Sequence, residues 1–147
     1  MTSADGILDT NTVILLPQID DVDDLPLRPT ITTITLAELS VGPLVARTDA
    51  ERAARLAHVQ QAESDFDPLP LDAAAARAFG RVAASLRRNG RKPSARAYDA
   101  LIAAIALAND LPLYTVNPDD FAGIDGLVVR SVPHPLSSNP LAQPRDK

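Results

Sequence analysis

The chain has 147 residues, of which 46% are hydrophobic, and a formal net charge of -5. This length and composition favour one globular domain with a substantial core, and the lack of cysteine excludes disulfides, thiolate nucleophiles and cysteine-ligated zinc. The two histidines, His58 and His134, lack sequence neighbours suited to a metal pair or a catalytic triad, so we expect both at the solvated surface. With no leader-like start and no apolar run of about 20 residues, we expect a cytoplasmic protein without a membrane span.

Strand-like and helical patterns of apolar residues alternate along the chain. In chain order they predict a strand at 6–9, a helix at 12–16, a strand at 30–34, helices from 35, at 50–63, at 73–88 and at 95–108, and strands at 111–116 and 126–132. An acidic segment lies between the first helix and the second strand, and we expect it to be a solvated loop rather than a metal cage. Its acids are Asp20, Asp21, Asp23 and Asp24.

Polar residues before several predicted helices are placed to cap them. Thr35 and Glu38 have the spacing of a capping box. Asp49, Asp72 and Ser94 each precede a helical pattern and are candidate caps for it.

Strands that alternate with helices predict a three-layer α/β/α sandwich with a mainly parallel central sheet. We expect residues 1–132 to form this domain and the proline-rich residues 133–147 to be a loose tail. Sheets of this kind place their ligand crevice at the carboxyl ends of the strands.

Asp99 is unusual because it lies in a helical run made almost entirely of Ala, Leu and Ile. Such a helix is expected to be buried, and an ionised carboxylate is costly there unless something compensates its charge. An ion pair with Arg96, three residues earlier, is one structural explanation.

Other carboxylates are expected at the same edge of the sheet. Asp9 ends the first strand, Glu38 opens the helix after the second, and Asp119 and Asp120 follow the third. Each alone has a structural explanation as a cap or turn residue. Together they would repel one another, and a hard divalent cation such as Mg²⁺ or Mn²⁺ removes that repulsion. The sequence therefore predicts a metal site held by carboxylates.

A cation held only by carboxylates suits phosphate chemistry, because it can orient a phosphodiester and lower the pKa of a bound water. The net charge argues against a general nucleic-acid coat, but the stretch from Ala73 to Tyr98 contains no acid and leads directly to Asp99. Its cations are candidate contacts for a polyanionic substrate or members of a solvated helix face. They are Arg77, Arg81, Arg87, Arg88, Arg91, Lys92 and Arg96.

Four motifs together resemble the PIN-domain family, in particular the VapC-type toxin ribonucleases: ILDTNTVI, ITTITLAELSVG, YDALIAAIALANDLPLYTVNPDDF and the closing strand. The resemblance runs from about Ile7 to Val132. It implies an α/β/α sandwich and a Mg²⁺- or Mn²⁺-dependent endoribonuclease. It also implies that the acids are Asp9, Glu38 and Asp99, with Asp9 and Asp99 as the principal metal ligands.

The fourth acid of the resemblance is ambiguous in this sequence. The first candidate position after the third strand is the neutral Asn117, and Asp119 and Asp120 follow it. We expect one of these two aspartates to take the role, acting through a water. The side chains of Thr10, Asn11 and Thr115 are expected to hydrogen-bond the carboxylates or a bound water.

The resemblance also implies partners. A cognate antitoxin would wrap the toxin and send a basic residue into the acidic site, which suits such a residue electrostatically. A homodimer is expected as well, with the apolar helical faces around Leu36 to Val45 as a candidate contact, alone or within a toxin–antitoxin hetero-oligomer.

Two other functions are weighed against the nuclease. A haloacid-dehalogenase-like phosphatase would use Asp9 as nucleophile and Lys92, but it needs an acid where Asn11 stands and leaves Glu38 and Asp99 unexplained. A catalytically inert PIN-like binding module would gain stability from an apolar residue in place of Asp99.

Overall fold

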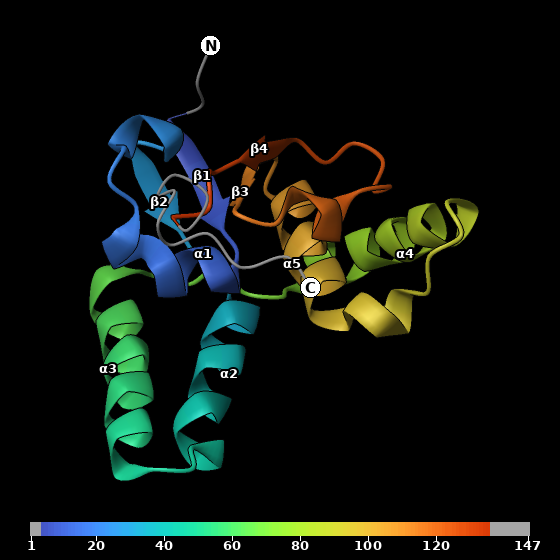
Figure 1. Ribbon diagram of the computed structural model, residues 1–147. Coiled ribbons are helices and arrows are strands. Elements are labelled where there is room, and N and C mark those ends of the chain that lie inside the picture. The colour runs from blue at the N-terminus through green and yellow to red at the C-terminus, as the bar shows by residue number, and fades with distance from the viewer. Residues whose placement is uncertain (1–3, 136–147) are drawn as a thin grey trace, which may run out of the picture.

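A computed structural model describes residues 4–135 of the protein, and these form a sheet covered by helices (Figure 1). The strands β1 (Asp5–Leu8), β2 (Arg28–Thr30), β3 (Leu113–Thr115) and β4 (Val129–Ser131) are all parallel and lie in the order β2-β1-β3-β4. The predicted fold class is confirmed. No helix in the described part of the chain is long and apolar enough to cross a membrane.

The helices flank this sheet on its two faces and extend below it. Figure 1 shows α4 and α5 on one side, α1 on the other, and α2 and α3 as a hairpin that projects away from the sheet. The helices are α1 (Thr10–Leu15), α2 (Thr33–Val41), α3 (Asp49–Asp65), α4 (Ala73–Arg88) and α5 (Ala97–Ala108). Short 3-10 turns connect them: η1 (Leu16–Gln18), η2 (Val22–Asp24), η3 (Gly42–Val45), η4 (Pro93–Arg96) and η5 (Pro118–Phe121).

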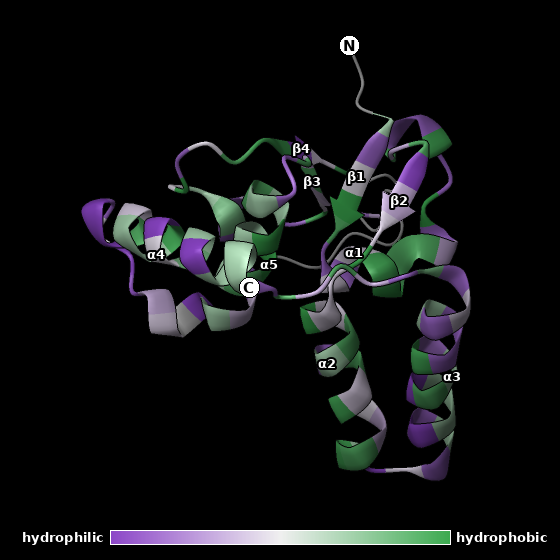
Figure 2. Cartoon of the chain, turned by 180° about the vertical axis from the view of Figure 1, so that it is seen from behind, coloured by the Kyte–Doolittle hydropathy of each residue, from purple (hydrophilic) through white to green (hydrophobic). Residues whose placement is uncertain are grey.

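Alternating side chains of β1 build the two halves of the core, because successive residues of a strand point to opposite faces. Ile7 packs into the cluster formed by α4 and α5, and Leu8 packs with Tyr114 against the side of α1. Small residues let α4 and α5 approach closely, and α5 is apolar along most of its length, as its green colour in Figure 2 shows. The predicted burial of the α5 centre is therefore confirmed.

Most element types follow the prediction, but three of the four predicted caps are wrong. The second strand is Arg28–Thr30 rather than the predicted 30–34. Thr32 is the N-cap of α2, its hydroxyl accepting the Thr35 N–H at 3.2 Å. The capping box of Thr35 and Glu38 is not formed, because both residues already lie inside the helix. Only Asp72 caps as expected, accepting the Ala75 N–H at 2.9 Å.

The other two caps fail by small shifts of the helix start. Thr48 caps α3, so Asp49 is the first helical residue. Ser94 lies inside the turn η4, and α5 begins without a side-chain cap. The acidic segment forms the exposed turn η2, and the predicted tail lies outside the described residues from position 136 onward.

Two glycines offer a matched test of this packing. A Cβ at Gly6 would lie 2.5 Å from Cε1 of Tyr114, whereas a Cβ at Gly80, inside α4, meets nothing within 4 Å. We expect Gly6→Ala to lower the free energy of unfolding by about 1–3 kcal/mol through overpacking. Gly80→Ala should raise it by about 0.4–1 kcal/mol through helix propensity. Urea unfolding measures both, and equal effects would contradict the described approach of β1 to Tyr114.

Candidate metal centre

The acidic residues gather where the strand order reverses. β1 lies between β2 and β3, so the chain leaves β1 toward one side and returns on the other. The carboxyl ends of β1 and β3 flank the resulting crevice, which is where open α/β sheets bind their ligands. Asp9 directly follows β1, and Thr115 is the last residue of β3.

Asp9 is the buried anchor of this site, with only 4% of its surface exposed. Its Oδ1 accepts the Thr12 N–H at 3.2 Å, which caps α1, and also a short hydrogen bond from the Thr12 hydroxyl. Its Oδ2 accepts the Thr115 hydroxyl at 2.8 Å. These bonds join the start of α1 to the end of β3 and fix the carboxylate in one orientation.

The two threonine hydroxyls are held in turn by backbone groups beyond β3. The Val116 N–H donates to the Thr12 oxygen at 3.1 Å, and the Asn117 N–H donates to the Thr115 oxygen at 2.9 Å. Since each oxygen accepts a backbone proton, each hydroxyl proton is directed to Asp9.

Glu38 reaches the site from the second turn of α2. The Thr10 hydroxyl donates to Glu38 Oε1 at 2.7 Å and lies 3.0 Å from the Thr35 hydroxyl. Thr10 is the residue next to Asp9, so this bond places the Glu38 carboxylate beside the start of α1.

Asp99 and Asp120 face a shared arginine at the start of α5. Arg96 Nη1 donates to Asp120 Oδ1 at 2.6 Å and lies 3.8 Å from Asp99 Oδ2. The two carboxylate side chains are each 26% exposed, whereas Asp119 is exposed to solvent. The structure therefore brings Asp120 to the other acids and leaves Asp119 outside.

The carboxylates are close enough to affect one another's protonation. Burial, followed by the charges of Asp120, Asp9 and Glu38, raises the pKa of Asp99 to about 6, against a smaller lowering by Arg96. Burial also raises the pKa of Asp9, although the hydrogen bonds from its two threonines oppose this. Burial and the charge of Asp9 raise the pKa of Glu38. The charges of Asp9, Glu38 and Asp120 thus all act on Asp99.

The donor set fits a hard divalent cation. Hard cations prefer oxygen ligands, and Mg²⁺ in proteins is usually held by one or two carboxylates and several waters. Within residues 4–135, no three acidic or histidine side chains stand close enough to ligate one ion directly. A hard cation held here by two of the carboxylates would need water in its remaining positions.

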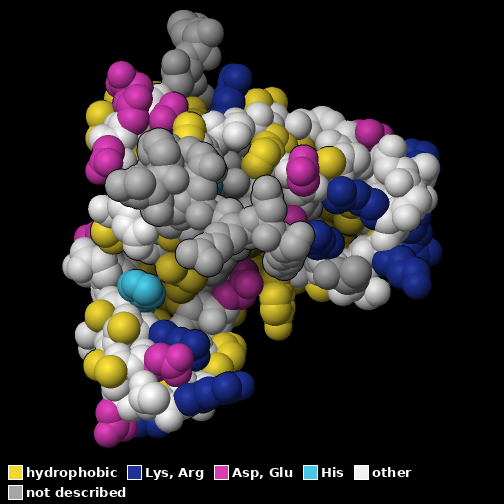
Figure 3. Space-filling view, in the orientation of Figure 1, with side chains coloured by type: hydrophobic (Ala, Val, Ile, Leu, Met, Phe, Trp, Pro, Cys, Tyr) yellow, Lys and Arg dark blue, Asp and Glu magenta, His cyan; other side chains and the backbone are white. Residues whose placement is uncertain are grey.

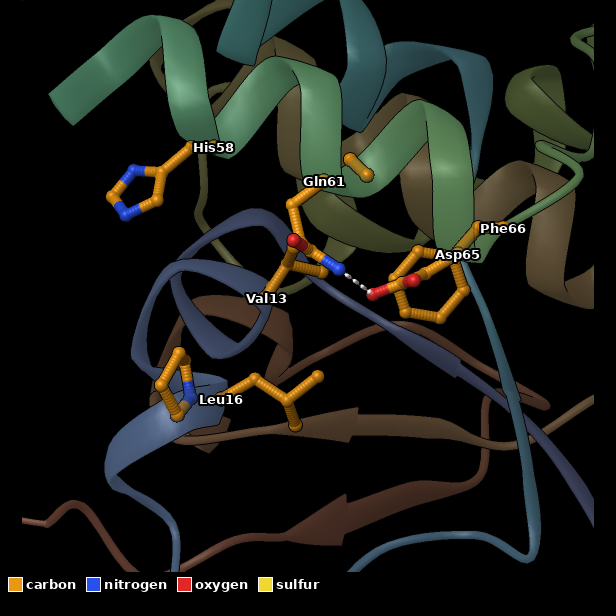
Figure 4. A pocket seen from close by; sticks show the side chains of 8 residues that line it. Val13, Leu16, His58, Gln61, Asp65 and Phe66 are labelled. Carbon is orange, nitrogen blue, oxygen red and sulfur yellow. Dashed lines mark hydrogen bonds between the residues drawn. The ribbon is translucent and has the colours of Figure 1, made fainter. Parts of the chain in front are cut away.

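Two hollows lie beside α3, and one of them borders this centre. One, of about 330 Å³, opens beside Thr10 and Glu38 and extends between α2 and α3 to Arg55 and His58. The other, of about 320 Å³, is a mainly apolar groove between α1 and α3. Figure 4 shows its lining, which includes Val13, Leu16, His58, Gln61 and Phe66.

Several supporting residues differ from the sequence prediction. Thr10 and Thr115 hydrogen-bond carboxylates as expected, but Asn11 is exposed and makes no such bond in the described structure. The sequence prediction does not include Thr12, which lies three residues after the capping Asp9 and supports it through both its N–H and its hydroxyl. His58 is half-buried beside both hollows rather than fully solvated.

Comparison with known proteins places the chain in a family. Residues 7–127 match the family model of the PIN domain. Ribonuclease VapC5 of Mycobacterium tuberculosis is 41% identical over 127 residues, which cover 85% of this chain and 91% of that protein. Ribonuclease VapC8 of the same species is 34% identical over 101 residues, covering 69% and 89% of the two chains.

Solved structures agree with this. A chain in the crystal structure of the toxin–antitoxin system VapBC-5 from Mycobacterium tuberculosis matches with a TM-score of 0.73 and 39% identity, covering 88% of this chain and 98% of that one. A chain of DNA-bound VapBC from Salmonella typhimurium matches with a TM-score of 0.67 and 27% identity, covering 89% and 98%. The chain belongs to the PIN domain family. Within that family it falls in the VapC group.

The raised pKa of Asp99 predicts how the metal-free protein responds to pH. Because its native pKa of about 6 exceeds its ordinary value of 3.8, the native state binds more protons than the unfolded state in this window. The stability contributed by protonated Asp99 is complete at low pH and is lost as pH rises through about 6. The melting temperature in EDTA should therefore fall from about pH 4, near the unfolded pKa, to just above pH 6, near the native pKa, and Asp99→Asn should flatten that fall.

Asp119→Asn is the control for this measurement, because Asp119 is an exposed neighbour whose charge does not act on Asp99. It should keep the wild-type pH dependence. An unchanged slope in Asp99→Asn would show that the carboxylates are farther apart than described.

Proposed function

We propose that this protein is a metal-dependent endoribonuclease, the toxin of a type II toxin–antitoxin pair, which cleaves RNA phosphodiesters at the carboxylate centre. The observation that carries the proposal is the convergence of Asp9, Glu38, Asp99 and Asp120 at the switch point of the sheet. The VapC ribonucleases among its relatives support the same activity.

Each side chain has a definite task in this mechanism. Asp9 and Asp99 would hold Mg²⁺, or Mn²⁺ in its place, and the ion would polarise the phosphate and lower the pKa of a water. Asp9 is suited to direct ligation because its threonine bonds fix its orientation and leave acceptor capacity on Oδ2. Glu38, half-buried with a raised pKa, is suited to orient the attacking water and take its proton. Asp120 would contact the site through water.

The substrate would be held by the basic surface of α4. Its arginines at positions 77, 81 and 88 share one helix face, since they are spaced by four and seven residues. In Figure 3, Lys and Arg side chains gather at the right, over α4 and the loop that follows it, whereas acids gather at the upper left. Of the cations on α4, only Arg88 has an acidic partner within the described residues, the carboxylate of Asp125. Arg77, Arg81 and Arg87, which form no ion pair within residues 4–135, would contact RNA phosphates.

A cognate antitoxin would inhibit the enzyme by occupying the two hollows. The apolar groove between α1 and α3 suits hydrophobic side chains, and the hollow beside Glu38 suits a basic one that reaches the acids. The solved VapBC-5 relative is a toxin–antitoxin system, which supports such a partner. Exposed Val41, Leu44 and Val45 at the end of the α2–α3 hairpin would contribute to a homodimer.

The alternative activities are less well supported. A haloacid-dehalogenase-like phosphatase would need an acid in place of the exposed Asn11 and gives no role to Glu38 or Asp99. An inert binding module would not need four buried or half-buried carboxylates that repel one another, because apolar residues in their place would make the fold more stable.

Asp99→Asn should abolish RNA cleavage and keep the fold. Loss of a metal ligand removes the ion that stabilises the transition state, while loss of a repelled charge should raise the melting temperature in EDTA. RNA cleavage mapping, together with melting with and without Mg²⁺, measures both effects. Wild-type protein should be stabilised by Mg²⁺ and the variant much less, because a ligand stabilises only the state that binds it.

Asp119→Asn again serves as the matched control, and it should retain cleavage and the response to Mg²⁺. Equal ribonuclease activity in Asp99→Asn and wild type would end the assignment. Release of free phosphate from small phosphomonoesters would favour the phosphatase, and a melting temperature insensitive to Mg²⁺ would favour the binding module.

Binding of RNA by α4 predicts a specific salt dependence. Each lost phosphate contact to a single strand should reduce the slope of log affinity against log salt by about 0.7. We expect the double variant Arg77→Gln/Arg81→Gln to show this loss twice, when a single-stranded RNA oligonucleotide is titrated in EDTA. The charge-matched variant Arg47→Gln/Arg52→Gln, on the α2–α3 hairpin side, should keep the wild-type slope. Equal slopes in all three proteins would show that the basic surface of α4 does not contact RNA phosphates.

A further inference from the structure

Arg96 is the one residue that brings a positive charge into contact with the acidic centre in the described part of the chain. Its Nη1 lies 2.6 Å from Asp120 Oδ1 and 3.8 Å from Asp99 Oδ2, so a single guanidinium nitrogen faces both carboxylates. The carboxylate of Asp99 is also the group that a metal ion would use under the proposed function. The Arg96 guanidinium and a metal ion would therefore compete for the Asp99 carboxylate.

The surroundings of Arg96 allow it to leave. Its side chain is 47% exposed, and it is the last residue of η4 and the N-cap of α5, before the α-helical backbone begins. Water can therefore reach the guanidinium and hydrate it when it moves away from the carboxylates. The negative charge that remains when it leaves is large, because the charges of Asp9 and Glu38 also act on Asp99. Departure of the arginine is favourable only when another cation replaces it.

We propose that Arg96 is a built-in counter-cation, which neutralises Asp99 and Asp120 in the metal-free protein and is displaced when the metal binds. This inference rests on the proposed function, since it concerns the same metal site. Its first consequence is that Arg96 weakens metal binding, both by direct competition and by repelling a divalent charge. Its second is that the displaced guanidinium, still tethered beside the centre, is free to bind a non-bridging oxygen of the scissile phosphate.

Calorimetric titration with Mn²⁺ and Mg²⁺ alone tests the first consequence. Arg96→Gln should bind either ion roughly tenfold more tightly than wild type, as expected for removal of one nearby positive charge. Arg28→Gln is the matched control, because Arg28 also forms an arginine–aspartate pair, with Asp5, but at the opposite end of the strands. Its metal affinity should equal that of wild type. An Arg96→Gln protein with unchanged or weaker affinity would overturn the inference.

Thermal melting supplies a second readout that does not depend on activity. In EDTA, Arg96→Gln should melt below wild type, because its acids have lost their counter-charge, and saturating Mg²⁺ should remove the difference. Arg28→Gln should show the same small loss in both conditions. If the loss in Arg96→Gln is equally large with Mg²⁺, the arginine is merely a structural ion pair. Arg96→Lys, which keeps the charge, should resemble wild type in metal affinity and guards against a folding defect in Arg96→Gln.

RNA cleavage at saturating metal tests the second consequence. Despite its tighter metal binding, Arg96→Gln should cleave about 10²-fold more slowly, the typical effect of losing one donor to a transition state. Full activity of Arg96→Gln at saturating metal would show that Arg96 does not stabilise the transition state of cleavage. Failure of the proposed function is distinguishable from either result, because it would appear as ribonuclease activity in Asp99→Asn, whatever Arg96 does.

Discussion

Mutual repulsion of carboxylates at the carboxyl ends of β1 and β3 is the constraint on which this site depends. Asp9, Glu38, Asp99 and Asp120 come from four separate segments of the chain, yet the charges of the other three all act on Asp99. Such an arrangement opposes folding unless each charge is compensated. The protein supplies partial compensation locally, through threonine hydroxyls at Asp9 and Glu38 and through Arg96 at Asp99 and Asp120.

The threonines do more than reduce the cost of burial. The hydroxyl oxygens of Thr12 and Thr115 each accept a hydrogen bond from a backbone N–H of the segment after β3, and each hydroxyl donates one to Asp9. The orientation of the deepest carboxylate is thereby tied to the geometry of the sheet itself. A fixed carboxylate loses little conformational entropy on binding an ion, which is the general advantage of preorganised ligands. The acids nearer the surface have looser support, and Arg96 holds them only at the exposed rim.

Basic and apolar side chains lie on different parts of the surface around the acids. A chain with a net charge of -5 must still attract a polyanion if it acts on RNA, and its cations are concentrated on α4 and the segment before α5. The hairpin of α2 and α3 exposes Val41, Leu44 and Val45 at its end, and it borders both hollows. Under the proposed function, RNA would bind along α4 and the antitoxin along the α2–α3 hairpin, and both would reach the carboxylates.

The sequence alone determined the alternation of strands and helices, the burial of α5 and the candidate acids, because apolar periodicity and isolated carboxylates in apolar runs are local signals. Within the PIN domain family, those signals are sufficient to identify Asp9, Glu38 and Asp99 as the residues to examine. Only the tertiary structure decided which of Asp119 and Asp120 faces the others, that Thr12 supports Asp9, and that Thr32 rather than Thr35 begins α2. It also showed that Arg96 bridges two acids 21 residues apart. A shift of one to three residues in where a turn or helix begins decides which side chain faces the site, and contacts between distant segments decide the rest. Local sequence spacing determines neither.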